Sequence, residues 1–205
     1  MTDFTQEVIA FTSQIDVLEL SGFIFGILAV WYLIKENILT WPAGIIYIFI
    51  SFVIFYRTKL YADLALHFVF LMLNIYGWYF WIKGRKEGLD LPVTTISVKF
   101  LGLIFGMCAV GIWIMGTLFE KYTDAAVPFW DSTTTILSLA GMWLTARKKI
   151  EYWLFWIIVD ILATGIYIYK EIYFYAALYG IYIVLASVGY FSWKKSMENV
   201  VVARS

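Results

Sequence analysis

Seven long, continuously apolar runs dominate this chain of 205 residues. A helix that crosses the hydrocarbon core of a bilayer needs roughly 20 mostly apolar residues, and flanking Trp and Tyr side chains extend the shorter runs toward that length. Strands of a membrane barrel would instead alternate over about 10 residues. The pattern predicts an all-α integral membrane protein, with residues 1–205 forming a single membrane domain. Its seven expected transmembrane helices lie at 17–34, 42–56, 61–82, 96–118, 133–146, 152–169 and 172–193.

The composition supports this class and excludes several others. Hydrophobic residues make up 62% of the chain and charged residues 15%, against about 45–50% and 25% in a soluble domain. Cys108 is the only cysteine and His67 the only histidine. An intrachain disulfide and the usual zinc or haem ligand sets are therefore excluded. We expect no cofactor, and a net charge of zero gives no indication of nucleic-acid binding.

The cations between the runs predict the orientation. With the N-terminus outside, the inside segments carry 11 Lys and Arg residues and the outside segments carry 4, as the positive-inside rule requires. The first sixteen residues contain Asp3, Glu7 and Asp16 but no Lys or Arg. They therefore differ from a secretory signal, which starts with basic residues. We expect the first span to be retained, the N-terminus to lie outside and the C-terminus inside.

An internal repeat relates the two parts of the chain. Sliding the chain along itself until Trp41 falls on Trp153 places the first three spans on the last three without a gap; we call this offset the repeat displacement. The span at 96–118 stays unmatched, and an odd number of intervening spans gives the second copy the orientation of the first. We predict parallel repeats at 17–83 and 128–194 joined by a linker helix at 96–118, as in SWEET transporters. The aligned pairs are Trp31 and Trp143, Trp41 and Trp153, Tyr61 and Tyr173, Gly77 and Gly189, and Trp81 and Trp193.

Polar and aromatic side chains inside the spans predict a ligand site near the midplane. Polar groups in a membrane cost free energy, so they usually face a cavity or one another. Aromatic faces stack on a flat ring and favour a positively charged one, while hydroxyl, amide and carboxylate groups bond a sugar. The candidate substrate-binding residues share helical faces within their spans. They are His67, Asn74 and Trp78; Ser132 and Thr135; Trp156 and Asp160; and Tyr175, Tyr179 and Tyr182.

Several of these side chains also have simpler interpretations. Trp41, Trp81, Trp153 and Trp193 lie near span ends, where anchoring at the membrane interface is favoured over ligand contact. His67 is equally consistent with a hydrogen bond between helices, and the tyrosines of the last span with packing alone. Asn74 and Asp160 lie well inside their spans and are the hardest to explain without a ligand.

Three stretches carry a family resemblance: Tyr61–Leu64 continuing to Asn74–Trp81 in the third span, Pro128–Ser132 before the fifth, and Arg147–Trp153 before the sixth. They resemble the PnuC family of bacterial nicotinamide riboside transporters and related vitamin carriers. The resemblance extends from about Leu20 to Trp193, and the third-span stretch is specific. Members often carry Gln in place of His67 and Asn in place of Asp160.

This resemblance implies a SWEET-like fold of 3 + 1 + 3 helices and uptake of nicotinamide riboside across the bacterial inner membrane. It further implies facilitated diffusion by alternating access, a homotrimer, and trapping of the riboside by a separate cytoplasmic kinase during NAD biosynthesis. Transport of thiamine, riboflavin or nucleosides is the alternative. A seven-span receptor is a weaker one, since residues 173–193 lack the lysine that retinal requires. No recognisable catalytic motif indicates an enzyme.

Overall fold

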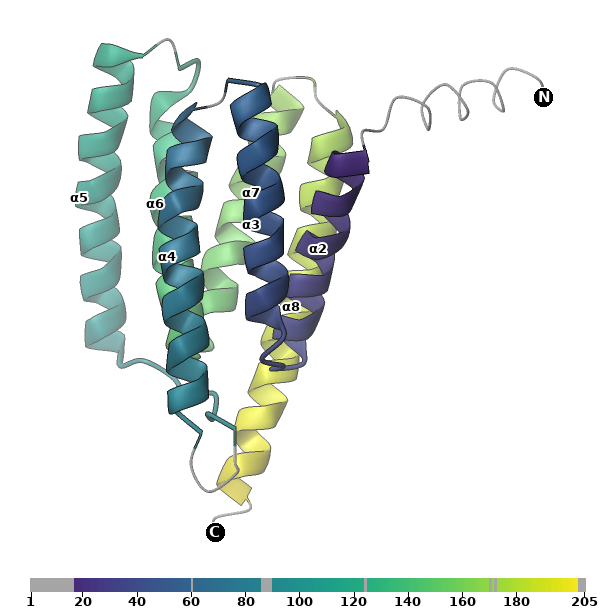
Figure 1. Ribbon diagram of the computed structural model, residues 1–205. Helices are drawn as coiled ribbons and strands as arrows, with labels where there is room; N and C mark the ends of the chain where they lie inside the picture. Colours follow the sequence, from purple (N-terminus) through teal and green to yellow (C-terminus); the bar gives the residue numbers. More distant parts are fainter. Residues whose placement is uncertain are drawn as a thin grey trace, which may run out of the picture.

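The computed structural model describes residues 17–59, 61–85, 90–123, 125–169, 171 and 173–202. The acidic stretch 1–16, from which we predicted an outside N-terminus, lies outside the described residues. Successive helices run in opposite directions (Figure 1). We call the end with the α2–α3, α4–α5 and α6–α7 connections the lower end, as drawn there. The seven helices in the described residues are α2 (Val17–Ile34), α3 (Thr40–Arg57), α4 (Tyr61–Lys83), α5 (Val98–Tyr122), α6 (Pro128–Ala146), α7 (Tyr152–Tyr169) and α8 (Tyr173–Val202).

The prediction of an all-helical membrane protein is confirmed. Six helices are long and apolar enough to cross a membrane, namely α2, α3, α4, α5, α7 and α8. The first turns of α6 are rich in Ser and Thr, which lowers its hydropathy. These hydroxyls bond within the helix: Ser132 Oγ donates to the Pro128 carbonyl oxygen and Thr133 Oγ1 to that of Phe129, each at 2.7 Å. Such bonds leave the polarity of α6 largely satisfied.

Local signals move some helix ends from their predicted positions. The Ser97 hydroxyl caps α5 by accepting from the Phe100 N–H at 3.3 Å, so α5 begins at Val98, two residues later than expected. Pro128 occupies the start of α6, because proline has no N–H to lose there and its φ already suits a helix. That helix therefore begins five residues before the predicted 133. α8 continues beyond its predicted end at Trp193 to Val202.

Six helices close into a ring and the seventh stands outside it. α2 packs on α3, α3 on α4, α4 on α6, α6 on α7, α7 on α8, and α8 returns to α2. α5 packs on α6 at one side of the bundle (Figure 1). Phe105 of α5 also stacks on Phe155 of α7, with ring centroids 5.2 Å apart. The helices α2–α4 and α6–α8 thus take equal parts of the ring, and α5 covers the second part.

Four tryptophans form a buried layer toward the lower end. Trp41, Trp81, Trp153 and Trp193 are at most 3% exposed. Trp41 meets Trp81 edge-on at 5.4 Å and Trp153 meets Trp193 edge-on at 5.5 Å, while Trp81 and Trp193 lie 6.2 Å apart. The prediction that these side chains anchor the protein at the membrane interface is therefore wrong, because they point into the ring and pack on one another. We call these four residues the tryptophan layer.

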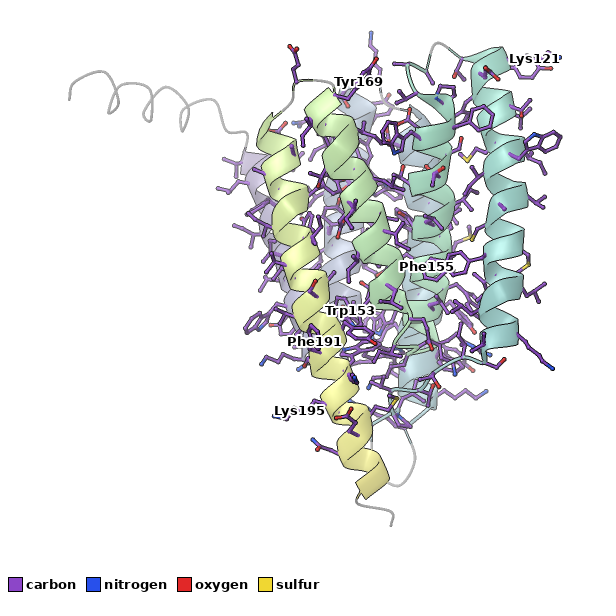
Figure 2. The ribbon with its side chains drawn as sticks, turned by 180° about the vertical axis from the view of Figure 1, so that it is seen from behind. Lys121, Trp153, Phe155, Tyr169, Phe191 and Lys195 are labelled. Carbon is purple, nitrogen blue, oxygen red and sulfur yellow. The ribbon has the colours of Figure 1, made fainter. Side chains whose placement is uncertain are left out.

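Further features recur at positions related by the repeat displacement. Trp41 packs against Gly77, and Trp153 packs in the same way against Gly189, so that a Cβ at either glycine would overlap the indole ring. Figure 2 shows Trp153 on α7 behind the lower half of α8, with Lys195 below it at the lower end. Four non-glycine residues with left-handed backbone also pair at this displacement. They are Glu36 and Lys148, with φ of 55° and 52°, and Lys59 and Glu171, with φ of 59° each.

Candidate functional site

Two predicted site residues, Asn74 and Asp160, lie buried near the middle of their helices. Asp160 is roughly 12 Å along α7 from Tyr152, at 1.5 Å per residue, and is 2% exposed; Asn74 is 6% exposed. The Asn74 amide donates to the Phe70 carbonyl oxygen at 2.9 Å. Gly44 of the neighbouring α3 gives it room, since a Cβ there would lie 2.7 Å from the Asn74 Oδ1.

Two tyrosines of α8 lie in the neighbourhood of Asp160. Tyr179 and Tyr182 are near enough to the Asp160 carboxyl group and to Tyr47 of α3 for the ionisation of one group to affect that of the others. Tyr179 stacks on Tyr167 with ring centroids 5.3 Å apart and meets Tyr182 edge-on at 5.8 Å. Three of the candidate residues, Asp160, Tyr179 and Tyr182, therefore lie in one region where α3, α7 and α8 meet.

His67 reaches this group through an aromatic contact. Its Nδ1 hydrogen-bonds the Asp63 carbonyl oxygen of its own helix at 2.9 Å. Its ring lies 4.7 Å from Phe55 and 6.1 Å from Tyr47, and the side chain is buried. In this arrangement Nδ1 is occupied and the ring is enclosed by aromatic neighbours, so any polar contact with a ligand falls to Nε2.

Trp156 offers a hydrogen-bond donor one turn below Asp160. Its indole Nε1 is buried and has no hydrogen-bond partner among the described residues. Gly141 of α6 makes space for it, since a Cβ at that position would lie 3.1 Å from Nε1. A buried donor without a partner costs free energy. The Trp156 N–H is thus available to an oxygen of a bound molecule.

The other four predicted residues are less closely tied to this group. Ser132 is fully buried, and its hydroxyl bonds within its own helix. Thr135 is half-buried one turn further along α6. Trp78 is half-buried and packs against the buried hydrophobic residues that include the tryptophan layer. The side chain of Tyr175 lies outside the described residues.

Tyr47 belongs to the group but was not predicted from the sequence, which placed the site on the third, fifth, sixth and seventh spans. A usable signal was present, because Gly44, Tyr47 and Ser51 are spaced by three and four residues and so share one face of the second span. Tyr167 of α7 was also not predicted. It lies seven residues after Asp160, two helical turns along a similar face.

The charge of this region is set by Asp160. The central residues of all seven helices contain no Lys or Arg. The sequence shows this over residues 40–56, 61–82 and 152–193, where the only exception is Lys170 between α7 and α8. A buried carboxylate costs free energy unless it is paired or protonated. Together with the tyrosine and indole faces, it suits a flat ligand that is neutral or positively charged, with hydroxyl groups for Asn74 and Trp156.

Comparisons with known proteins also match nearly the whole chain. The family described as "Nicotinamide mononucleotide transporter" matches residues 16–195. The nicotinamide riboside transporter PnuC of Escherichia coli (strain K12) is 29% identical, over 89% of this chain and 87% of that protein. The riboflavin/roseoflavin transporter RibM of Streptomyces davaonensis is 25% identical, over 92% and 90%. The crystal structure of the vitamin B3 transporter PnuC has a similar fold, with a TM-score of 0.75 at 21% identity over 95% of this chain and 88% of that one.

Proposed function

Because this chain belongs to the nicotinamide mononucleotide transporter family, and is thus a transporter and not an enzyme, we propose that it carries nicotinamide riboside across the bacterial inner membrane. One observation supports this substrate most directly. The buried carboxyl group of Asp160 lies near the middle of α7 and within electrostatic range of Tyr179 and Tyr182 of α8. The nicotinamide ring of the riboside is a flat cation, and this combination of charge and aromatic faces suits it.

The same carboxylate argues against the phosphorylated form of the substrate. A mononucleotide carries a phosphate in addition to the ring, and phosphate is usually bound by Arg, Lys or a helix N-terminus. The middle of the bundle has no Lys or Arg to fill that role. Bringing a phosphate close to Asp160 would add repulsion between like charges in a region of low dielectric. The proposed site therefore favours the riboside over the mononucleotide.

Each proposed site residue has a role in this arrangement. Tyr179, Tyr182 and Trp156, together with Trp78 and Tyr175, would form the aromatic walls around the nicotinamide ring, and one of these side chains would stack on each face of it. Asn74, His67, Ser132, Thr135 and Asp160 would hydrogen-bond the ribose hydroxyls or the carboxamide. Tyr47 of α3, which was not predicted from the sequence, would contact the ligand from the side of α3. A ligand that stacks through its ring and hydrogen-bonds through its sugar would account for the presence of both aromatic and polar side chains inside the bundle.

The helix arrangement supports an alternating-access mechanism. We infer that 17–83 and 128–194 are parallel repeats joined by α5, since α2–α4 and α6–α8 form equal parts of one ring and matching contacts recur at the repeat displacement. Rocking of the two parts would expose the central group first to one side and then to the other. The lower end, which carries most Lys and Arg residues, would face the cytoplasm.

Uptake would then follow the riboside gradient, maintained by a cytoplasmic kinase that phosphorylates the riboside and so traps it. We also propose that the protein assembles as a homotrimer. Uptake that follows an imposed proton gradient in sealed vesicles would contradict facilitated diffusion.

Transport of riboflavin is the second candidate. It is favoured by the similarity to RibM, which covers as much of this chain as the similarity to the riboside transporter. Isothermal titration calorimetry of the purified protein distinguishes the two, with nicotinamide riboside, nicotinamide mononucleotide, thiamine, riboflavin and nucleosides as separate titrants. We expect a response to the riboside and none to the mononucleotide. A response to riboflavin alone would overturn the proposed substrate.

Uptake of the riboside into sealed vesicles tests the site itself. Asn74→Ala should lower uptake by about tenfold or more, since it removes a buried amide that the ligand would bond. Ile75→Ala is the matched control, because Ile75 is the next residue of α4 but is 53% exposed on the outside of the bundle. Normal uptake by Asn74→Ala would exclude Asn74 from the site.

A further inference from the structure

A buried ion pair joins the two halves of the ring at the lower end. Lys148, in the α6–α7 connection, and Glu36, in the α2–α3 connection, are 2.9 Å apart at Nζ and Oε2. The Lys148 side chain is 1% exposed and that of Glu36 is 22% exposed. Both residues have left-handed backbone, which non-glycine residues rarely adopt. They are also related by the repeat displacement, so the pair links two positions that correspond in the proposed repeats.

The Lys148 ammonium group is held by three different segments. Besides Glu36, it donates to the Leu91 carbonyl oxygen, and it lies 4.7 Å from the centre of the Trp81 ring. Leu91 precedes α5, and Trp81 is on α4. Of these neighbours only Glu36 carries a negative charge. Separating Glu36 from Lys148 would leave a buried cation with neutral partners, which is strongly unfavourable.

Two indole hydrogen bonds beside this ion pair also cross between the halves. The Trp81 indole N–H of the first half donates to the Thr145 carbonyl oxygen of the second, at 3.2 Å. The Trp193 indole N–H of the second half donates to the Leu33 carbonyl oxygen of the first, at 2.9 Å. The Ser192 hydroxyl also donates to the Ile34 carbonyl oxygen at 3.2 Å, and the Arg147 guanidinium group donates to the Tyr76 hydroxyl at 2.9 Å. The lower end is therefore closed by the tryptophan layer, the ion pair and these hydrogen bonds.

The segment before α5 is fixed to the second half. The Thr94 N–H donates to the Lys148 carbonyl oxygen at 3.2 Å, and the Ile150 N–H donates to that of Thr94 at 3.0 Å. The Ile96 N–H donates to Glu151 Oε1 at 3.0 Å. Since α5 itself packs on α6, the linker and α6–α8 form one body. A relative movement of the halves would thus separate α2–α4 from everything that follows residue 90.

From this geometry we propose that Glu36 and Lys148 are the latch of a gate at the lower end, and that the structure shows this gate closed. Opening would separate the two side chains and break the two indole–carbonyl bonds. This inference rests on the proposed transport function, because a gate has a purpose only if a ligand passes.

Cysteine accessibility in the full-length protein, reconstituted in vesicles, tests the latch without any substrate. Ala186 of α8 is 3% exposed and lies roughly 10 Å above Trp193 along the helix. In a Cys108→Ala background, Ala186→Cys would be the only thiol, and a membrane-impermeant maleimide would reach it from the lower end only when the gate opens. Glu36→Gln keeps an acceptor oxygen but removes the negative charge that faces the buried Lys148 ammonium group. It should speed this labelling by about tenfold, because a charge-assisted hydrogen bond is roughly twice as strong as a neutral one.

Glu171→Gln is the matched control, because Glu171 also has left-handed backbone but lies in the α7–α8 connection, at the opposite end of α7 from Lys148. It should leave the rate of labelling from the lower end unchanged. Equal rates for Glu36→Gln and the parent protein would overturn the latch. A rise in labelling with Glu171→Gln as large as that with Glu36→Gln would also overturn it, since the effect would then not be specific to the pair.

Cross-linking provides a second test, because the same variant is compared before and after the link is cleaved. Glu36→Cys and Lys148→Cys, combined in the same Cys108→Ala background, would be joined with a cleavable bifunctional thiol reagent. We expect uptake of nicotinamide riboside to stop and to return after cleavage, while calorimetric binding persists. Uptake at the uncross-linked rate would refute the latch. Failure to bind the riboside at all would contradict the proposed substrate and leave the labelling result as the test of the gate.

Discussion

Replacing Gly77 or Gly189 by alanine should destabilise the bundle, because each glycine lies directly against an indole ring. A Cβ at Gly77 would overlap the Cη2, Cζ2 and Cζ3 atoms of Trp41, and a Cβ at Gly189 would overlap the same atoms of Trp153. These rings have little freedom to yield. Trp41 is 2% exposed and Trp153 is 1% exposed, and each packs edge-on against a second tryptophan of the layer.

The size of the effect follows from two opposing contributions. Inserting a methyl group into a well-packed core costs about 1–3 kcal/mol. Alanine is at the same time better than glycine in a helix, by up to about 1 kcal/mol. Gly106→Ala of α5 is the matched control, since a Cβ there meets nothing within 4 Å and only the helical gain applies. The difference between Gly77→Ala and this control should therefore be the steric cost, ~1–3 kcal/mol.

Thermal unfolding of the purified protein in detergent, followed by tryptophan fluorescence, measures this difference. For a chain of this size 1 kcal/mol corresponds to about 2–4 °C in Tm. Gly77→Ala should thus melt about 2–12 °C below Gly106→Ala, and Gly189→Ala should behave in the same way. Equal melting of Gly77→Ala and Gly106→Ala would refute tight packing in the tryptophan layer. Destabilisation by one glycine substitution alone would contradict the equivalence of the two halves.

Three further predictions concern other contacts. Asp160→Asn should weaken calorimetric binding of nicotinamide riboside about tenfold, or ~1.4 kcal/mol, because it removes the negative charge near the cationic ring; unchanged affinity would exclude that contact. Trp193→Phe should lower stability in thermal unfolding by about 1 kcal/mol through loss of the bond to the Leu33 carbonyl oxygen, whereas Trp113→Phe, at a side chain that is 66% exposed, should have little effect. Glu151→Ala should cost about 1–3 kcal/mol by releasing the Ile96 N–H, while Glu151→Gln keeps an acceptor oxygen and should retain most of that stability; equal Tm values for the two variants would contradict this.

The helices themselves could be predicted from the sequence because apolar length decides them. The runs at 17–34 and 152–169 match α2 and α7 at both ends. The largest differences occur where polarity is satisfied locally or where a helix leaves the apolar region. α6 begins at Pro128 because the hydroxyls of its first turns bond backward along the helix. The predicted span ended before Lys194 because a lysine is unfavourable inside the membrane. The helix itself continues to Val202, since a lysine outside the hydrocarbon core is compatible with a helix.

The candidate site could be predicted only in part. Asn74 and Asp160 were identifiable because an amide or a carboxylate in mid-span requires an explanation. Tyr47 was not, since a tyrosine in an aromatic-rich chain gives no signal until its neighbours are known. The tryptophan layer was misassigned for the opposite reason. Position near a span end favours the interface, and only the packing of Trp41 on Gly77 and of Trp153 on Gly189 shows that these rings point inward.

The halves correspond closely at the lower end and differ at the midplane, and this contrast bears on what the centre binds. In the tryptophan layer, equivalent positions carry identical residues and make equivalent contacts. At the midplane, the same displacement pairs Asn74 with Ala186, Ile48 with Asp160, and Gly44 with Trp156. Conformational rocking requires two halves of similar shape, whereas a ligand with a charged ring at one end and a sugar at the other requires two unlike walls. The matching residues of the tryptophan layer are thus consistent with two halves that move relative to each other. The different residues at the midplane are consistent with an asymmetric ligand such as a nucleoside.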